Sequence, residues 1–318
     1  MRLTRILFLA LIAASLPASA QTFPDRPLRI IVPFPPGGGT DILARLVGRR
    51  LTEALGQPVV VENRPGAGGT VGADAAAKSP PNGYTLLMVS ASYAVNPSLY
   101  RMTFDPLADL VPVSLVASVP FVLVSPPSLS ANSVNELVAL ARAEPGKINF
   151  ASSGNGSAPH LVGELFAMQT GTKLVHVPFK GGAPALTEVM GGRVEMYFST
   201  ISLAQPSLSA GKLKALAVTS RQRSSLLPRV PTLEESGVAG IDLVDWFGLL
   251  APRGTPAPIV SRLSEEIARQ VQGAEMKAQL ATDGFEAIGS SPAQFESVLR
   301  RDMSDYARIV KAVGVRID

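Results

Sequence analysis

The segment LRIIVPFPPGGGTD, residues 28–41, contains the pattern from which the architecture of this chain can be inferred. Its first five residues are apolar or β-branched apart from one arginine, which is typical of a buried strand. A loop rich in proline and glycine follows, and a helix is expected from about Thr40 to Leu55. The apolar residues expected on one face of this helix are Ile42, Leu43, Leu46, Val47 and Leu51. Gly56 lies where a glycine commonly ends a helix, so the segment predicts a strand–loop–helix unit.

The same unit recurs along the chain. Short apolar runs, each followed by a glycine- or serine-rich loop and a helical pattern, predict further strands at 59–61, 86–89, 148–151, 174–177, 194–198, 213–218 and 247–252. Strands that alternate with helices favour an α/β fold with mostly parallel sheets.

Two consecutive extended segments, 111–116 and 121–124, suggest a crossing between two lobes joined by a hinge. A second α/β unit begins after them. The C-terminal part reads as helical with no partner strands of its own, and we expect it to pack back on the first lobe. The predicted division is a signal peptide at 1–20, lobe 1 at 21–122 plus 244–318, and lobe 2 at 123–243.

The N-terminus has the pattern of an export signal. Arg2 and Arg5 precede an apolar run at 6–16, and Ala18-Ser19-Ala20 supplies a small-residue cleavage site. A membrane anchor is the alternative, but roughly eleven apolar residues are too few for a bilayer core that requires about twenty. We expect cleavage after Ala20 and a periplasmic mature protein.

Composition excludes several kinds of site. The chain has 318 residues and no cysteine, which rules out disulfides, cysteine-bound zinc and thiol catalysis. It has 29 basic and 25 acidic residues, and removal of the leader with Arg2 and Arg5 leaves 27 against 25. No basic run with interleaved aromatic residues occurs, so no nucleic-acid partner is expected. Neither a cofactor nor a metal is expected, since no cluster of possible ligands has metal-site spacing.

Glycine- and serine-rich loops that open helices occur in both halves, at 36–40, 66–70, 152–157 and 179–183. Helix N-termini carry unpaired N–H groups and a partial positive charge, and therefore attract anions. In open α/β sheets such loops gather at the carboxyl ends of the strands. One such loop also fits a purely local turn, but their recurrence predicts a cleft that grips a carboxylate from both sides.

Other functions have weaker support in the sequence. The loop at 37–41 lacks the lysine of a P-loop and the third glycine of a dinucleotide fingerprint. His160 and His176 are the only histidines, and a hydrogen-bonded structural role is expected for each. Ser157 lies in a segment that resembles a nucleophile elbow only loosely, with the wrong glycine spacing. A periplasmic serine hydrolase and a sensor that signals to a membrane kinase therefore stay as alternatives.

Several ordered motifs resemble the Bug family, the extracytoplasmic receptors of tripartite tricarboxylate transporters. They include PLRIIVPFPPGGGTD at 27–41, GQPVVVENRPGAGG at 56–69, PGKINFASSGNGS at 145–157, HVPFKGGAPA at 176–185 and WFGLLAP at 246–252. The resemblance implies a type II periplasmic-binding-protein fold, and we expect a monomeric receptor that is not an enzyme and needs no cofactor. It also implies a small carboxylate ligand and membrane permease subunits as partners.

The resemblance further implies which residues line the ligand site. These are Pro36, Gly37, Gly38, Gly39, Thr40, Asp41, Ser90, Ser92, Ser152, Ser153, Asn155, Ser157, Phe179, Lys180, Ser199 and Thr200. One position departs from the family pattern, because Ser199 stands where members commonly carry an aspartate. A lost carboxylate would remove a partner for an ammonium group, so the hypothesis at this point is a ligand without an amino group.

Overall fold

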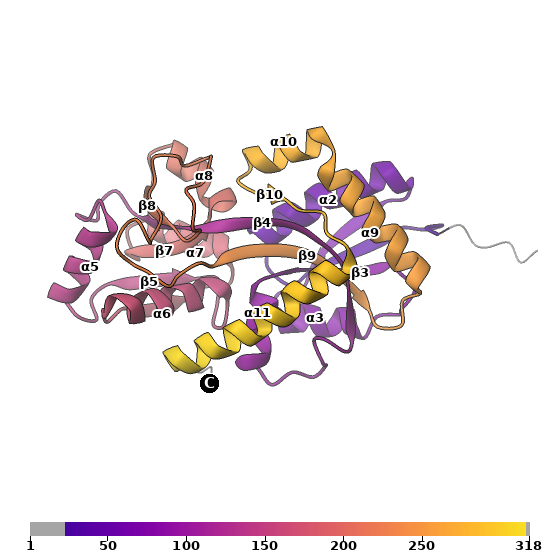
Figure 1. Ribbon diagram of the computed structural model, residues 1–318, viewed down its shortest axis with the longest axis horizontal. Coiled ribbons are helices and arrows are strands. Elements are labelled where there is room, and N and C mark those ends of the chain that lie inside the picture. Colours follow the sequence, from indigo (N-terminus) through magenta and orange to yellow (C-terminus); the bar gives the residue numbers. More distant parts are fainter. Residues whose placement is uncertain (1–22, 316–318) are drawn as a thin grey trace, which may run out of the picture.

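The computed structural model describes residues 23–315, so the expected signal peptide at 1–20 lies outside the described residues. Within this range the chain forms two α/β halves, which lie side by side along the longest axis of the molecule (Figure 1). Two long strands run from one half to the other. Among the described residues, eight strands join into one continuous path of hydrogen-bonded neighbours, in the order β2-β1-β3-β9-β4-β7-β5-β6, and β8 and β10 pair with β4 beside this path.

The first half is built from the strand–loop–helix units expected from the sequence. Its parallel strands are β1 (Leu28–Val32), β2 (Val59–Asn63) and β3 (Thr85–Ser90). Its helices are α2 (Gly39–Leu55), α3 (Thr70–Ala77) and the short α4 (Ser92–Val95), with single 3-10 turns at Ala67–Gly69 and Asn96–Ser98. Helix α2 buries Leu43, Leu46, Val47 and Leu51, and it ends at Gly56, whose left-handed φ of 69° suits glycine.

The crossing is made by β4 (Leu110–Ser125) and β9 (Val244–Pro252), which pair antiparallel along the whole of β9. The two extended segments expected at 111–116 and 121–124 are thus parts of one 16-residue strand. Its first part pairs with β9 in the sheet of the first half, and its last five residues pair with strands of the second half. The proposed lobe boundary at residue 122 therefore lies inside a strand.

The second half repeats the architecture of the first. Its strands are β5 (Asn149–Ser152), β6 (Val175–Pro178), β7 (Met196–Thr200) and β8 (Lys214–Val218). Its helices are α5 (Val134–Ala143), α6 (Ala158–Thr170), α7 (Gly182–Met190) and α8 (Ile201–Ser209). Strand β5 pairs parallel with β6 and β7, whereas β7 and β8 pair antiparallel with β4. The sheet is parallel in its outer parts and antiparallel around the two crossing strands.

The C-terminal region is mostly helical, with α9 (Ala257–Gln272), α10 (Ala274–Thr282) and α11 (Pro292–Val313). The expectation that it adds no strand is wrong, because β10 (Glu286–Ala287) pairs antiparallel with β4 at Ser118 and Ala117. Two residues are too few to produce a recognisable alternation in the sequence. Helix α11 packs on β4 and α4 and also reaches α6 of the second half, and Figure 1 shows it running diagonally across both parts.

Apolar side chains fill the space between the sheet and the helices. The largest fully buried side chains include Phe121, Phe150, Phe198, Phe247 and Phe295, which come from both halves and from α11. Trp246 is buried as well, and its ring meets that of Phe295 edge to face. Among residues 23–315 there is no helix with the length and apolar character that crossing a bilayer requires.

Candidate functional site

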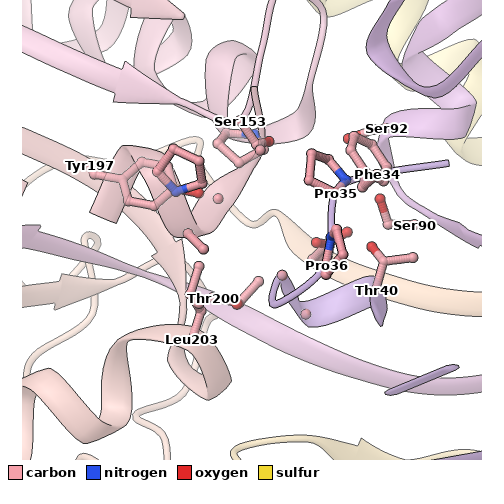
Figure 2. Close-up of a pocket in the computed structure, with 18 residues that line it drawn as sticks. Phe34, Pro35, Pro36, Thr40, Ser90, Ser92, Ser153, Tyr197, Thr200 and Leu203 are labelled. Atoms are coloured by element: carbon pink, nitrogen blue, oxygen red, sulfur yellow. The ribbon is translucent and has the colours of Figure 1, made fainter. Parts of the chain in front are cut away.

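A small cavity of about 50 Å³ lies between the two halves. A space of this size has room for a few atoms, since a single water needs about 10–15 Å³ of comparable volume. Figure 2 shows Thr40, Ser90 and Ser92 on one side, facing Tyr197, Thr200 and Leu203 on the other. The remaining lining residues are Phe34, Pro35, Pro36, Gly38, Gly39, Ser153, Pro159, Gly181, Gly182, Ala183, Pro184 and Asp245.

Besides the short α4, which begins at Ser92, four helices begin at this cavity, one from the first half and three from the second. Helices α2, α6, α7 and α8 contribute Gly39, Pro159, Gly182 and Leu203 from their first turns to the lining. None of the four has a side chain of its N-cap residue bonded to its first turn. Backbone N–H groups at such ends are suited to an anion, and here they approach from both sides.

Glycine at the start of α7 allows the second half to come this close. Gly181 has φ 117°, a conformation that other residues rarely adopt, and a Cβ there would lie 3.3 Å from Pro35 of the first half. A Cβ on Gly182 would lie 2.9 Å from Leu203 Cδ2 and 3.1 Å from the Tyr197 hydroxyl. A side chain at residue 182 would therefore displace residues that line the cavity.

The halves also bond to each other directly. The Ser92 hydroxyl on α4 accepts a hydrogen bond from the backbone N–H of Ala158 at the start of α6, over 3.0 Å. The Tyr100 hydroxyl donates to the backbone carbonyl of Asn155. These contacts hold the two halves against each other, so the structure is in a closed arrangement.

Asp41 does not line the cavity but holds the loop that does. Its carboxylate accepts hydrogen bonds from the Gly37 N–H over 3.0 Å, from Arg45 over 2.9 and 3.0 Å, and from Asn63 over 2.9 Å. Burial raises the pKa of Asp41, but the bonds from Arg45, Gly37 and Asn63 outweigh it and leave the pKa below its usual value. Gly37 likewise stays outside the lining, and Asn63 also donates to the Phe34 carbonyl.

Three of the serines expected at the site use their hydroxyls within their own loops. Ser152 donates to Gly154, Ser157 also donates to Gly154, and Ser199 donates to the carbonyl of Thr200. The side chains expected at Asn155, Phe179 and Lys180 lie along a neighbouring groove of about 580 Å³, which shares Phe34, Pro35, Ser153 and Gly181 with the cavity. The lining thus includes Pro36, Gly38, Gly39, Thr40, Ser90, Ser92, Ser153 and Thr200 of the expected set.

The two histidines stack on each other behind this wall, with ring centroids 3.7 Å apart. His176 Nε2 lies 2.6 Å from the Ser152 hydroxyl, and His160 Nδ1 accepts the backbone N–H of Gly156. Burial, together with the charge that His160 would carry, lowers the pKa of His176 to about 3. Neither ring lines the cavity and Ser157 bonds elsewhere, so the imidazoles brace the loop that follows β5.

Asp245 lines the cavity and was missed in the sequence. It lies in β9, is 7 % exposed, and accepts the backbone N–H of Ala91 over 3.0 Å. Burial raises its pKa to about 7, against the lowering effect of bonds from the backbone N–H groups of Ala91 and Trp246. The signal in the sequence was a single acidic residue inside an otherwise apolar strand. A carboxyl group buried in this way requires either a hydrogen-bonding partner or a functional role.

Asp245 bears on the hypothesis that the ligand lacks an amino group, which was based on a serine at residue 199 in place of an aspartate. Ser199 is not part of the cavity lining, and its hydroxyl donates to the carbonyl of Thr200, whereas Asp245 contributes a carboxyl group to the lining. The absence of an aspartate at residue 199 therefore does not leave the cavity without an acidic group. The Tyr197 hydroxyl lies in the same lining, and burial together with the charge of Asp245 raises its pKa.

Several known proteins resemble this chain over most of its length. The family model for the tripartite tricarboxylate transporter family receptor matches residues 43–315. BugT of Bordetella pertussis is 39 % identical over 325 residues, covering the whole of both chains. A solved structure described as R. palustris Rpa4515 with adipate is 36 % identical, with a TM-score of 0.90 over 92 % of this chain and 99 % of that one.

A second solved structure, MatC from Rhodopseudomonas palustris with bound malate, is 30 % identical. It gives a TM-score of 0.85 over 91 % of this chain and 100 % of its own. Both structural relatives thus match over nearly their full length, and the resemblance of the motifs to the Bug proteins is confirmed. The chain belongs to the tripartite tricarboxylate transporter receptor family of solute-binding proteins.

Proposed function

We propose that this protein captures a small carboxylate in the cavity between its halves and delivers it to membrane permease subunits. The observation that carries the proposal is the convergence of the N-termini of α2, α7 and α8, none of which is capped by the side chain of its N-cap residue, on one cavity between the halves. The relatives solved with adipate and malate support a carboxylate as the ligand class.

Binding would proceed in two steps. An anion first meets the N-terminus of α2 and the hydroxyls of Thr40 and Ser90, since the loop before α2 is already held in place by Asp41. Closure then brings the starts of α7 and α8 against the ligand. The bond from Ala158 to Ser92 forms only when the halves meet, so it adds to the closed state alone.

The closed form would then be the one that a permease recognises. We further propose that the N-terminal 20 residues direct export and are removed after Ala20, which places the mature monomer in the periplasm. The pattern of two arginines, an apolar run and a small-residue site supports this part of the proposal. Mass spectrometry of the exported protein tests it, with Gln21 expected as the first residue.

A binding screen of residues 21–318 tests the ligand class. Mono-, di- and tricarboxylates and amino acids are added in a thermal-unfolding assay, and positives are measured by calorimetry. A ligand at about 100 times its Kd should add about 2.7 kcal/mol to stability. Absence of stabilisation by every carboxylate, in a protein that unfolds cooperatively, would remove the proposal.

Two alanine variants of the same helix locate the binding site. Gly182→Ala places a methyl against Leu203 and Tyr197, and overpacking of about 1–3 kcal/mol predicts a Kd at least several-fold higher. Gly191→Ala lies at the exposed far end of α7, where the new methyl meets only the flexible Arg193 side chain. Equal affinity of the two variants would place the ligand elsewhere.

A further inference from the structure

Asp245 occupies a position in the cavity that the capture of an anion does not by itself explain. Among residues 23–315, the charged or titratable groups in the lining are Asp245 and Tyr197, and no arginine, lysine or histidine lies there. A carboxylate ligand would thus enter a buried space that already contains an acidic residue without a cation. Two ionised carboxylates cannot share such a space at small separation without a large electrostatic cost.

The groups around Asp245 do not supply a counter-charge either. Its Oδ1 accepts the N–H of Ala91 at the end of β3, which is a neutral donor. The phenols of Tyr197 on β7 and Tyr306 on α11 are close enough for its charge to contribute to raising their pKa values, so both are neutral. Asp302 on α11, which accepts the indole N–H of Trp246, lies outside the cavity and is paired with Arg301 over 2.9 Å, so neither residue of this pair supplies a free charge to Asp245.

We propose that Asp245 meets the bound ligand as a neutral carboxylic acid, whose O–H donates to a carboxylate oxygen of the ligand. The proton comes from bulk solvent and is retained on Asp245 while the ligand is bound, so a protein in which Asp245 is ionised before binding takes up one proton with each ligand. This inference rests on the proposed function and narrows the ligand to carboxylates that present a hydrogen-bond acceptor at Asp245, such as dicarboxylates, instead of zwitterionic amino acids.

The electrostatics of the empty cavity are consistent with this assignment. Burial already raises the pKa of Asp245 to about 7, and an anion placed beside it raises the pKa further. An ammonium group would act in the opposite direction, stabilise the ionised form and release any bound proton. The sign of the proton exchange therefore distinguishes a carboxylate from an ammonium at this position.

Calorimetry at pH 8, in two buffers that differ in ionisation enthalpy, measures this exchange. The probes are malate, adipate and aspartate, of which malate and aspartate differ by a hydroxyl in place of an ammonium. For malate or adipate we expect uptake of nearly one proton per ligand. The affinity for that ligand should fall by up to tenfold per pH unit above pH 7.

Asp245→Asn provides the decisive variant, because the amide keeps the shape and an N–H donor but cannot titrate. We expect it to bind the dicarboxylate within a few-fold of the original affinity at pH 7, with no proton uptake and no fall in affinity at higher pH. Asp302→Asn is the matched control, since Asp302 lies outside the cavity, and it should leave the proton uptake unchanged.

The outcomes separate the inference from the proposed function. Tight dicarboxylate binding without proton uptake, uptake that persists in Asp245→Asn, or tighter binding of aspartate with proton release would each overturn the inference and leave carboxylate capture intact. Failure of all carboxylates to bind the folded protein would remove both.

Discussion

The backbone N–H of Ala158 donates to the hydroxyl of Ser92 over 3.0 Å, and the two residues belong to opposite halves of the molecule. Ser92 also lines the cavity, so one side chain takes part both in the wall of the site and in its closure. The N-cap residue of α6 makes no side-chain bond to the first turn, so the first backbone N–H of this helix is paired instead with a residue 66 positions earlier in the chain.

Replacement of Ser92 by alanine should weaken ligand binding more than it weakens the fold. The lost hydrogen bond is worth about 0.5–1.5 kcal/mol, which corresponds to a Kd roughly 2- to 13-fold higher. Calorimetry with the best ligand of the screen measures the effect. Ser130→Ala, at an exposed serine remote from the cavity, is the control and should bind as the unaltered protein does; equal affinities of both variants would contradict a role in closure.

Asp41→Asn tests whether the loop before α2 is held in its binding shape. The variant removes a charged acceptor from Gly37, Arg45 and Asn63, and hydrogen bonds to charged groups contribute about 1.5–3 kcal/mol each. We expect a lower denaturation midpoint and at least tenfold weaker binding. Asp305→Asn, which removes an exposed partner of Arg308, should change neither quantity measurably.

The stability of the fold should depend on the protonation of Asp41 at acidic pH. Its folded pKa lies below the usual 3.8, so its stabilisation is present above pH 3.8 and is lost as the pH falls through the folded value. Urea titrations between pH 5 and pH 3 should show a drop in stability that is smaller in Asp41→Asn. An identical drop in both proteins would mean that the carboxylate is not protected in the folded state.

His176 and Asp245 should produce opposite slopes of stability with pH. His176 is neutral in the folded protein down to about pH 3, whereas an unfolded histidine binds a proton below about 6.5, so acidification through this range destabilises the fold. Asp245 stays protonated to about pH 7 when folded and ionises near 3.8 when unfolded, so stability falls as the pH rises between those values.

Each slope is at most about 1.4 kcal/mol per pH unit, and less for the partly exposed His176. Between pH 4 and pH 6.5 the two contributions largely offset each other. His176→Gln should expose the Asp245 slope, with stability falling as the pH rises, and Asp245→Asn should expose the reverse. Parallel profiles of both variants, followed by chemical denaturation, would refute the assignment.

Two glycines in helix interiors should respond to alanine in opposite directions. A Cβ on Gly163 of α6 would lie 2.3 Å from Phe150 Cε2, which predicts a loss of about 1–3 kcal/mol by overpacking. A Cβ on Gly48 of α2 would meet Val59 at an ordinary 3.5 Å, so the helix preference for alanine predicts a gain of about 0.5–1 kcal/mol. Relative to the unaltered protein, the denaturant midpoint should be lower for Gly163→Ala and higher for Gly48→Ala.

Most strands and helices of this protein could be predicted from the sequence, because the residues with an apolar local pattern are also the residues that the fold buries. The run Leu28–Val32 is apolar and is a buried strand, and the helix expected from Thr40 begins one residue earlier, at Gly39. What could not be predicted depends on long-range pairing. The extended segments on either side of Pro120 form one strand because β9, more than 120 residues later, pairs with residues 110–120, and β7 and β8 pair with residues 121–125.

The site was predicted in part for the same reason. Glycine-rich loops revealed where helices begin, and Gly38, Gly39 and Thr40 do line the cavity. Sequence alone does not show how a hydroxyl or carboxylate is oriented, so residues such as Asp41 and Ser157 could not be separated from those that face the ligand. Asp245 was missed because the strand expected at 247–252 begins three residues earlier in the structure, at Val244, and so includes it.

The paired strands β4 and β9 have a consequence for how the receptor can signal that it is loaded. The halves are joined by the hydrogen-bonded strands β4 and β9 and not by flexible peptide linkers. Relative motion of the halves therefore requires bending of this two-stranded segment. Helix α11, which touches both parts, further restricts the permitted directions. The two halves would therefore open and close along one main direction. A membrane partner would meet the same closed arrangement whichever ligand is bound.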